Sequence, residues 1–179
     1  MSYKDFSMER SKVIPDIRII KPSVNWDNRG NIYTSFNNDF YTDMIGEKLD
    51  FIHDKFALSK ADVLRGLHGD NKTWKLVSCV YGKLYEVVVD MRPESPTYKK
   101  WDAFTLDSGA YSQVLIPPRF VNGYYVLSED AVFHYKLAYS GNYIDADEQL
   151  TIAWNDPDLE IEWPCTNPIL QARDNVLEK

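Results

Sequence analysis

Short stretches of alternating hydrophobic and polar residues, separated by turn residues, run through most of the chain. Successive side chains of a strand point to opposite faces, so this period of two predicts β-strands with one buried face. The clearest pattern predicts a hairpin over residues 74–92 that turns at Tyr81, Gly82 and Lys83. A second hairpin is predicted over residues 122–141, with its turn at residues 128–130. Further strands are predicted at residues 13–24, 31–36, 49–59, 63–70, 99–106 and 112–120.

Helical segments are few. A short helix is predicted at residues 38–46, where Asn37 or Asn38 can cap its start and Gly46 can end it. The tail, residues 168–179, also has a helical pattern, and residues 1–12 form a polar leader that we expect to be loose. No repeat or linker divides the chain, so one domain is expected over residues 1–179. Many short strands at regular spacing predict a mainly β fold, a barrel or jelly roll with a few short helices.

Composition narrows the function. A net charge of −7 argues against a nucleic-acid partner, which would require a basic stripe. Two cysteines, Cys79 and Cys165, are too few for a disulfide framework or a cysteine-based zinc site. No segment has the length and hydropathy of a membrane span, and the start of the chain has no apolar signal region. A cytoplasmic protein without a membrane partner is therefore expected.

The histidine at position 68 is the first candidate for chemistry. It lies between a predicted strand and a turn, and its neighbours Gly66 and Gly69 indicate close approach of the backbone to another group. A metal site of the His-x-His type would need a second histidine two residues later and a carboxylate beyond it. Here Gly69 and Asp70 follow, so no metal is predicted, although a site built from His68, Asp70 and His53 is the alternative.

Other charged and aromatic residues each allow two interpretations. Alternation places His134 and Tyr135 on opposite faces, so if Tyr135 points inward, His134 is structural. Lys75 in a strand is either edge protection or a cation in a cavity. Arg29 and Arg65 are either surface residues or a clamp for a diphosphate. The sequence has no glycine-rich phosphate loop, so side chains would have to hold any nucleotide.

Eight segments carry a resemblance to a known family, and in order they are DNRG at 27–30, VLRGLH at 63–68, KLV at 75–77, VVVDMRPESPTY at 87–98, IPPRF at 116–120, LSEDAVFHYK at 127–136, WNDPDLEIEWP at 154–164 and LQARD at 170–174. Through these segments the chain resembles the dTDP-4-dehydrorhamnose 3,5-epimerases along nearly its whole length. Four further segments are FIHDKF at 51–56, LHGD at 67–70, KTWKLVSCVYG at 72–82, and WNDP at 154–157 with the preceding YIDADEQ. Through them the chain resembles most closely a branch that acts on GDP-linked 4-keto heptoses for surface polysaccharides.

This resemblance implies a jelly-roll cupin without metal or cofactor, usually a homodimer, whose substrate is a nucleotide-diphosphate sugar. His68 would be the base, Asp174 would hold its other ring nitrogen, Lys75 would stabilise an enolate, and Tyr135 would be the acid on the opposite face. The residues expected to bind substrate are Arg29 and Arg65 at the diphosphate, Trp26 at the nucleotide base, and Asn122 and His53.

A histidine, a lysine and a tyrosine are residue types that suit epimerisation beside a ketone. A hydrogen beside a C4 ketone is acidic because the carbanion spreads onto oxygen, and its removal needs a base with a pKa near neutral, such as histidine. A fixed cation stabilises the developing oxyanion. Inversion needs a second group to return the proton from the other side. The resemblance therefore implies epimerisation at C3 and C5, which the presence of Tyr135 favours.

Two departures from the family pattern stand beside the site. After IPPRF the family usually continues with a small residue and His-Gly, whereas here Asn122 occupies the histidine position and can only form hydrogen bonds. An aromatic residue and glutamine usually follow the catalytic histidine, whereas here Gly69 and Asp70 do. We expect Gly69 to open room for a larger sugar such as a heptose.

Three other functions stay open. An epimerase acting at C3 alone and a sugar 3,4-ketoisomerase are the enzymatic alternatives on a related scaffold. A non-catalytic binding protein for nucleotide sugars is the alternative from another class.

Overall fold

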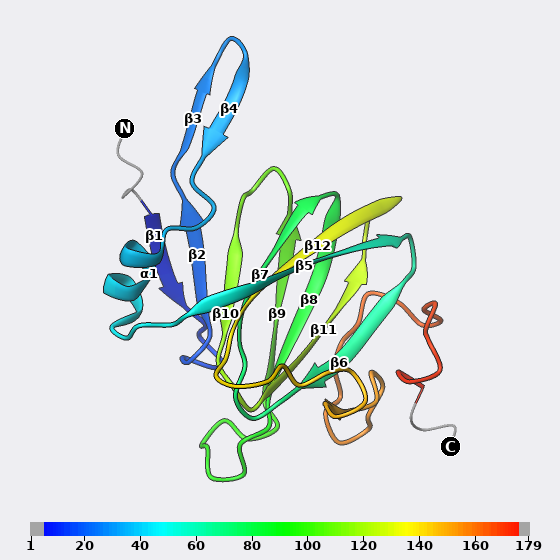
Figure 1. Cartoon of the computed structure of the whole chain (residues 1–179). Helices are drawn as coiled ribbons and strands as arrows, with labels where there is room; N and C mark the ends of the chain where they lie inside the picture. Colours follow the sequence, from blue (N-terminus) through cyan, green and yellow to red (C-terminus); the bar gives the residue numbers. More distant parts are fainter. Residues whose placement is uncertain (1–5, 176–179) are drawn as a thin grey trace.

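Two β-sheets face each other and enclose the core (Figure 1) in the computed structural model, which describes residues 6–175. One sheet has six strands in the order β1-β2-β10-β7-β12-β5, and the other has five in the order β13-β6-β11-β8-β9. This cupin-like jelly roll confirms the predicted mainly β class. The strands of the two sheets are β1 (Phe6–Arg10), β2 (Arg18–Pro22), β5 (Phe51–Lys60), β6 (Leu64–Gly69), β7 (Trp74–Tyr81), β8 (Lys83–Asp90), β9 (Trp101–Asp107), β10 (Gln113–Ile116), β11 (Phe120–Val126), β12 (Asp130–Ala138) and β13 (Leu150–Thr151).

The two predicted hairpins are wrong in how their strands pair. Their strands and turns are present, but β7 and β8 belong to different sheets, as do β11 and β12. Each tight turn therefore carries the chain from one sheet to the facing one, and the two turns pack against each other. A side chain at Gly82 would meet the carbonyl oxygen of Asp130 at 2.2 Å, and the Lys83 amide donates to Ser128 Oγ. Alternation and turn residues are the same for a hairpin and for a crossover between sheets, so the sequence could not separate them.

The predicted helix is confirmed as α1 (Asn38–Ile45). The Asn37 side chain accepts a hydrogen bond from the Phe40 amide, and Gly46 ends the helix in the left-handed conformation. Tyr41 and Ile45 of α1 are buried on the outer face of the six-stranded sheet.

Both ends of the chain differ from the sequence predictions. Within the predicted loose leader, β1 pairs with β2 throughout its length, while residues 1–5 lie outside the described part. The predicted strand at residues 13–24 is reduced to β2, followed by the start of another strand. Residues 168–175 contain turns and no helix, and residues 176–179 lie outside the described part.

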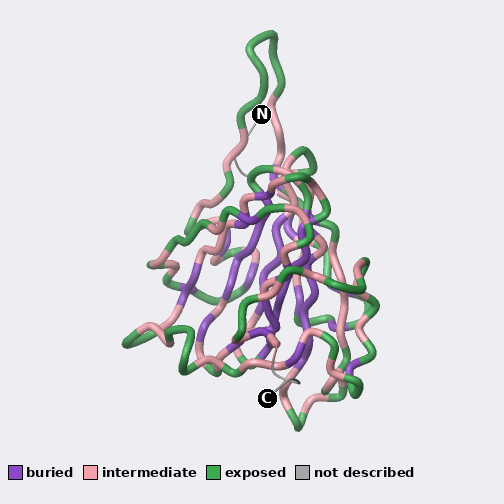
Figure 2. Tube along the Cα trace, turned by 90° about the vertical axis from the view of Figure 1, so that its right-hand side faces the viewer, coloured by how far each residue is buried: buried purple, intermediate pink, exposed green. Residues whose placement is uncertain are grey.

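A separate hairpin of β3 (Val24–Asp27) and β4 (Gly30–Tyr33) confirms the predicted turn at residues 27–30. It projects away from the two sheets (Figure 1). Figure 2 shows that most of its length is exposed, in contrast to the buried middle of the sheets. Two large side chains on it are largely exposed, Trp26 at 68% and Ile32 at 74%.

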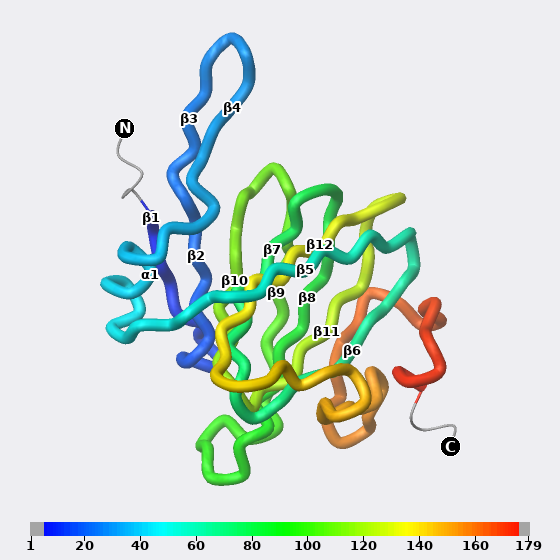
Figure 3. Tube along the Cα trace, in the orientation of Figure 1, coloured from blue at the N-terminus to red at the C-terminus, as the bar shows by residue number. Residues whose placement is uncertain are grey.

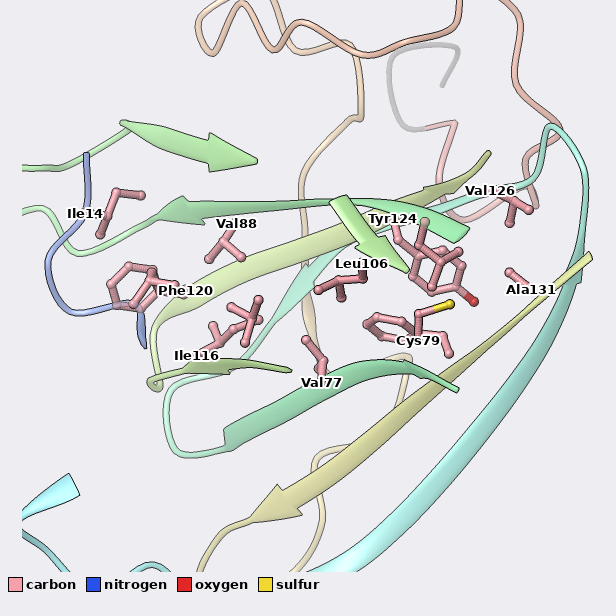
Figure 4. Packing of buried hydrophobic residues seen from close by; sticks show 14 residues of the cluster. Ile14, Val77, Cys79, Val88, Leu106, Ile116, Phe120, Tyr124, Val126 and Ala131 are labelled. Atoms are coloured by element: carbon pink, nitrogen blue, oxygen red, sulfur yellow. The ribbon is translucent and has the colours of Figure 1, made fainter. Parts of the chain in front are cut away.

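Apolar side chains from both sheets fill part of the interior (Figure 4). Val77 and Cys79 of β7 meet Val88 of β8 and Leu106 of β9, and Phe120 and Val126 of β11 complete the contact. Burial of these side chains stabilises the pair of sheets by about 25 cal/mol for each Å² removed from water.

The last third of the chain closes the open edge of the five-stranded sheet (Figure 3). Leu150 and Thr151 of β13 pair with Gly69 and His68, and Ile169 forms a parallel bridge with Val63. The tail is therefore fixed beside β6. Of the helices in residues 6–175, none has the length and hydropathy needed to span a bilayer.

Candidate active site

A cavity of about 270 Å³ lies between the sheets beside the apolar core. It receives side chains from β5, β6, β7, β11 and β12, and from two segments of the last third of the chain. Its polar lining residues are Lys55, Arg65, His68, Asp70, Thr73, Lys75, Asn122, Tyr124, Tyr135, Tyr143, Asp145, Gln149, Gln171 and Arg173.

A register shift in β6 places two predicted site residues in this cavity. Strict alternation would put Arg65 and His68, three residues apart, on opposite faces. The pairing of β6 with β11 shifts between Asn122 and Tyr124, so both side chains line the cavity. The strands approach so closely there that a side chain at Gly66 would lie 2.5 Å from the Gly123 Cα atom. Glycine at both positions therefore permits the arrangement.

His68 forms a hydrogen bond with the tail. Its Nε2 atom lies 2.6 Å from Asp174 Oδ1, and the Asp174 side chain is fully buried. A carboxylate can only accept, so Nε2 carries the proton and Nδ1 is left as the basic nitrogen. The other oxygen, Asp174 Oδ2, has no hydrogen-bond partner among residues 6–175.

Lys75 is held by two acceptors. Its ammonium donates to the His68 carbonyl oxygen at 3.0 Å and to Asn122 Oδ1 at 2.7 Å. Asn122 in turn donates from Nδ2 to Glu86 Oε1 at 2.8 Å. An ammonium has three protons, so one remains for a ligand in the cavity.

Burial changes the acidity of this chain of polar groups. It lowers the pKa of Lys75 to about 8, while the nearby Asp70 and Glu86 carboxylates raise it. Burial also raises the pKa of Glu86 to about 8, while the hydrogen bond from Asn122 and the charge of Lys75 lower it. Both pKa shifts favour the neutral forms of Lys75 and Glu86, because removal from water disfavours the charged form of each group.

Tyr135 comes from the other sheet. Its ring packs edge-on against Phe133, and its hydroxyl makes no hydrogen bond with any residue in the range 6–175. Burial holds the pKa of this phenol well above its ordinary value, so the group is protonated at neutral pH. Tyr135 therefore presents a proton donor to the cavity. His134, the preceding residue, lies outside the cavity, hydrogen-bonded to Asp54 and stacked on Phe56, as the alternation predicts.

Cations gather around the cavity. Arg65 donates from Nε to Ser59 Oγ, and its guanidinium also interacts with the Tyr124 hydroxyl at the cavity. Lys55 donates to the Tyr143 hydroxyl, and Arg173 contacts Gln149. The sequence did not single out Lys55 and Arg173, although each neighbours a predicted residue, two positions after His53 and one before Asp174.

Glu86 was also missed. Glu86 lies on β8 between Leu84 and Val88, and all three side chains point toward the interior of the protein. The alternation predicts apolar residues at these positions. A charged residue at such a position is itself a signal of a polar site.

Three predicted substrate-binding residues lie outside this cavity within the single chain. Trp26 and Arg29 are on the projecting hairpin, where Arg29 pairs with Asp27. His53 lies behind the lining, in contact with the rings of Tyr139 and Tyr143. Their role in substrate binding stays a prediction. Within residues 6–175, no group of three or more His, Cys, Asp or Glu side chains is placed to hold a metal ion, so His68, Asp70 and His53 form no such group.

The expectation that Gly69 enlarges the cavity is wrong. A side chain built at Gly69 would lie 2.0 Å from the carbonyl oxygen of Phe120. The space is filled by the backbone of β11, so glycine at this position permits strand contact and adds no room for a substrate.

The fold is a cupin-like jelly roll, and its cavity is lined by His68, Lys75 and Tyr135. A family model described as dTDP-4-dehydrorhamnose 3,5-epimerase matches residues 11–179. The chain belongs to this family, whose members are isomerases.

Relatives support the assignment in sequence and in structure. The dTDP-4-dehydrorhamnose 3,5-epimerase of Salmonella typhimurium is 41% identical over 165 residues, covering 90% of this chain and 88% of the relative. A dTDP-6-deoxy-D-glucose-3,5-epimerase from Legionella pneumophila, solved with dTDP-4-keto-L-rhamnose, has a TM-score of 0.88 and 34% identity, covering 94% of this chain and 89% of its own. A 3′-monoepimerase from Streptomyces bikiniensis, solved with dTDP-quinovose, has a TM-score of 0.85 and 26% identity over 93% of this chain and 84% of its own.

Proposed function

We propose that this protein epimerises a nucleotide-linked 4-keto sugar at C3 and C5. The observation that carries the proposal is the meeting of His68, oriented by Asp174, with Lys75 and Tyr135 at one cavity. A base, a cation and an acid are the groups that inversion through an enolate requires.

In the first step, His68 Nδ1 takes the proton from C3, and the electron pair of the C–H bond moves onto the C4 oxygen. Asp174 holds the ring and stabilises the imidazolium that forms, because it accepts from Nε2. The remaining proton of Lys75 binds the C4 oxygen as its negative charge develops. The other two Lys75 protons are held by His68 O and Asn122, so the ammonium needs no reorganisation during the reaction.

In the second step, the enolate collapses and C3 takes the proton of the Tyr135 hydroxyl on the opposite face. The raised pKa keeps this phenol protonated until the enolate draws the proton away. Solvent then takes the extra proton from His68 and returns a proton to the Tyr135 phenolate. The same cycle at C5 completes the double inversion.

Arg65 holds the diphosphate. A planar guanidinium suits a bidentate contact, and Lys55 and Arg173 add positive charge around the same cavity. The favoured substrate is a GDP-linked 4-keto heptose for surface polysaccharide synthesis, and a dTDP-linked 4-keto-6-deoxyhexose comes next.

The protein acts as a homodimer in which Arg29 and Trp26 reach the substrate of a second copy. Support comes from the projecting hairpin, whose Trp26 and Ile32 are exposed in one chain. Mixing two inactive variants, His68→Asn and Arg29→Ala, tests the arrangement. Activity in the mixture would support active sites built from two subunits. A mixture without activity would contradict that arrangement.

The test of the function is solvent deuterium incorporation into a panel of 4-keto nucleotide sugars, read by mass and by position. Wild type should incorporate deuterium at both C3 and C5 and yield inverted product. Incorporation at C3 alone would favour the monoepimerase activity named for the Streptomyces bikiniensis relative. Binding without any incorporation would favour the non-catalytic alternative.

Tyr135→Phe sharpens this test. Proton abstraction by His68 should persist, so deuterium washes in, while the yield of inverted product falls because the opposite face has lost its donor. Tyr81→Phe, which changes an exposed phenol at the far end of β7, should behave as wild type. Unimpaired inversion by Tyr135→Phe would remove Tyr135 from the mechanism.

A further inference from the structure

The turn that links β6 to β7 carries two polar groups with unused bonding capacity. Asp70 Oδ1 accepts hydrogen bonds from the amides of Lys72 and Thr73, at 2.9 and 2.7 Å. Its other oxygen, Oδ2, is buried and has no partner among residues 6–175. The Thr73 hydroxyl is likewise buried and without a partner in that range, and the residue is only 2% exposed. Both residues line the cavity.

Unpartnered buried polar atoms are costly, and a ligand that bonds to them removes the cost. A carboxylate oxygen accepts a hydrogen bond, and a threonine hydroxyl donates one and accepts another. Together they match a neutral hydroxyl group. They do not match a phosphate, which the Asp70 carboxylate would repel.

Position along β6 indicates which part of the substrate this hydroxyl belongs to. Arg65, the proposed diphosphate contact, precedes His68 by roughly 10 Å of strand, and Asp70 follows His68 by roughly 7 Å. His68 thus lies between the phosphate end and the turn. A pyranose bound with C1 toward Arg65 and C4 at Lys75 directs the groups farthest from the diphosphate toward Asp70 and Thr73.

We propose that Asp70 and Thr73 form a subsite for a hydroxyl carried on the C5 side chain of the sugar, and thereby select 4-keto sugars whose C5 substituent is longer and more polar than a methyl group. This inference rests on the proposed epimerisation and names the substrate class within it. It also replaces the role expected of Gly69, since selection comes from bonding partners and not from added space.

Two substrates with the same nucleotide and ring, differing only in a methyl or a hydroxyethyl group at C5, test the subsite. Wild type should prefer the hydroxyethyl substrate in kcat/KM by about tenfold or more, since a site built for a hydroxyl discriminates against its absence. Thr73→Val keeps the shape of the side chain and should lower kcat/KM for that substrate by about 10- to 100-fold, with less than about twofold change for the methyl substrate.

Thr73→Ser keeps a hydroxyl and should retain most of the kcat/KM that Thr73→Val loses on the hydroxyethyl substrate. Such activity would also show that the turn folds in a Thr73 variant. Thr105→Val makes the same chemical change at an exposed position of β9 and should leave both substrates unaffected. Asp70→Asn should reduce the preference as well. It should also move the alkaline limb of the pH profile to lower pH, because the Asp70 charge raises the pKa of Lys75.

The outcomes separate the two proposals. Equal losses on both substrates with Thr73→Val would assign the subsite to a ring hydroxyl and overturn the inference. A wild-type preference for the methyl substrate would also overturn it. If wild type exchanges no proton of either substrate, the proposed epimerisation fails instead.

Discussion

The interior of the barrel has an apolar half and a polar half, and single strands pass through both. On β7, the inward side chain of Lys75 lines the cavity, whereas Val77 and Cys79 enter the apolar core. On β11, Asn122 lies at the cavity and Val126 in the core. Alternation therefore decides which side chains point inward, and residue type decides whether the interior becomes a packed core or a reactive cavity.

The two halves contribute differently to stability. The apolar half contributes through burial and close packing. In the polar half, Asp174 Oδ2 and Glu86 Oε2 are buried with no partner among the described residues, and each such atom costs about 1–3 kcal/mol. We expect substitutions in one half to change mainly stability and those in the other to change mainly activity.

The largest effect is expected from His68→Asn. Loss of the base should lower kcat/KM by about 10²–10⁴-fold. The free energy of unfolding should fall by about 1–3 kcal/mol, because the shorter asparagine leaves the buried Asp174 Oδ1 without its partner. Proton exchange kinetics and urea unfolding check the two quantities. A stability loss that accounts for the activity loss would contradict the separation of the two halves.

Leu106→Ala should produce the opposite result. Leu106 is 1% exposed in the apolar half, and truncating such a leucine costs about 2–5 kcal/mol of unfolding free energy. Below the unfolding transition, kcat/KM should stay close to that of wild type. Urea unfolding and turnover at low temperature measure both, and a large fall in turnover of the folded variant would show that the halves are coupled.

Asp174→Asn should lower kcat by about 10- to 100-fold with little change in KM, since Asp174 acts on His68 and not on the substrate. An amide can donate to Nε2, which would favour the wrong tautomer of the imidazole. Asp158→Asn, which removes an exposed carboxylate paired with Lys99, is the control and should leave kcat unchanged. A rise in KM with constant kcat would instead indicate a role in binding.

The smallest effect is on the pH profile. The proposed mechanism requires protonated Lys75, and burial lowers its pKa to about 8, so kcat/KM should fall about tenfold per pH unit above that value. Because the folded-state pKa lies below the ordinary value of 10.5, the contribution of this group to stability rises as the pH increases from about 8 to 10.5. Titration of Lys75 above pH 8 should therefore lower kcat/KM without lowering the free energy of unfolding. A profile flat to pH 10 would contradict the assigned role.

Much of this molecule could be predicted from its sequence. The period of two locates most strands, and Asn37 and Gly46 mark the ends of α1 because each has a specific capping geometry. The alternation also separates Tyr135 in the cavity from His134 outside it. These features depend on residues close together in the sequence, so the local pattern of hydrophobic, polar and capping residues predicts them.

The features that could not be predicted depend on contacts between distant segments. Nothing local distinguishes a hairpin from the crossover at Gly82, because the difference is the sheet that each strand joins. The tail has a helical pattern, but residues 168–175 are held against β6 by contacts such as that of Ile169 with Val63. The register shift that brings Arg65 beside His68 arises from β11, and the role of Gly69 depends on the backbone of Phe120.

His68 and Asp174 are separated by 106 positions in the chain. During synthesis the imidazole therefore leaves the ribosome well before its carboxylate partner has been translated. A nascent chain whose sheets have already formed still has an unoriented histidine, and it becomes competent for proton transfer only when the tail docks along β6. The order of translation thus delays the pairing of His68 until residue 174 has been made and has docked.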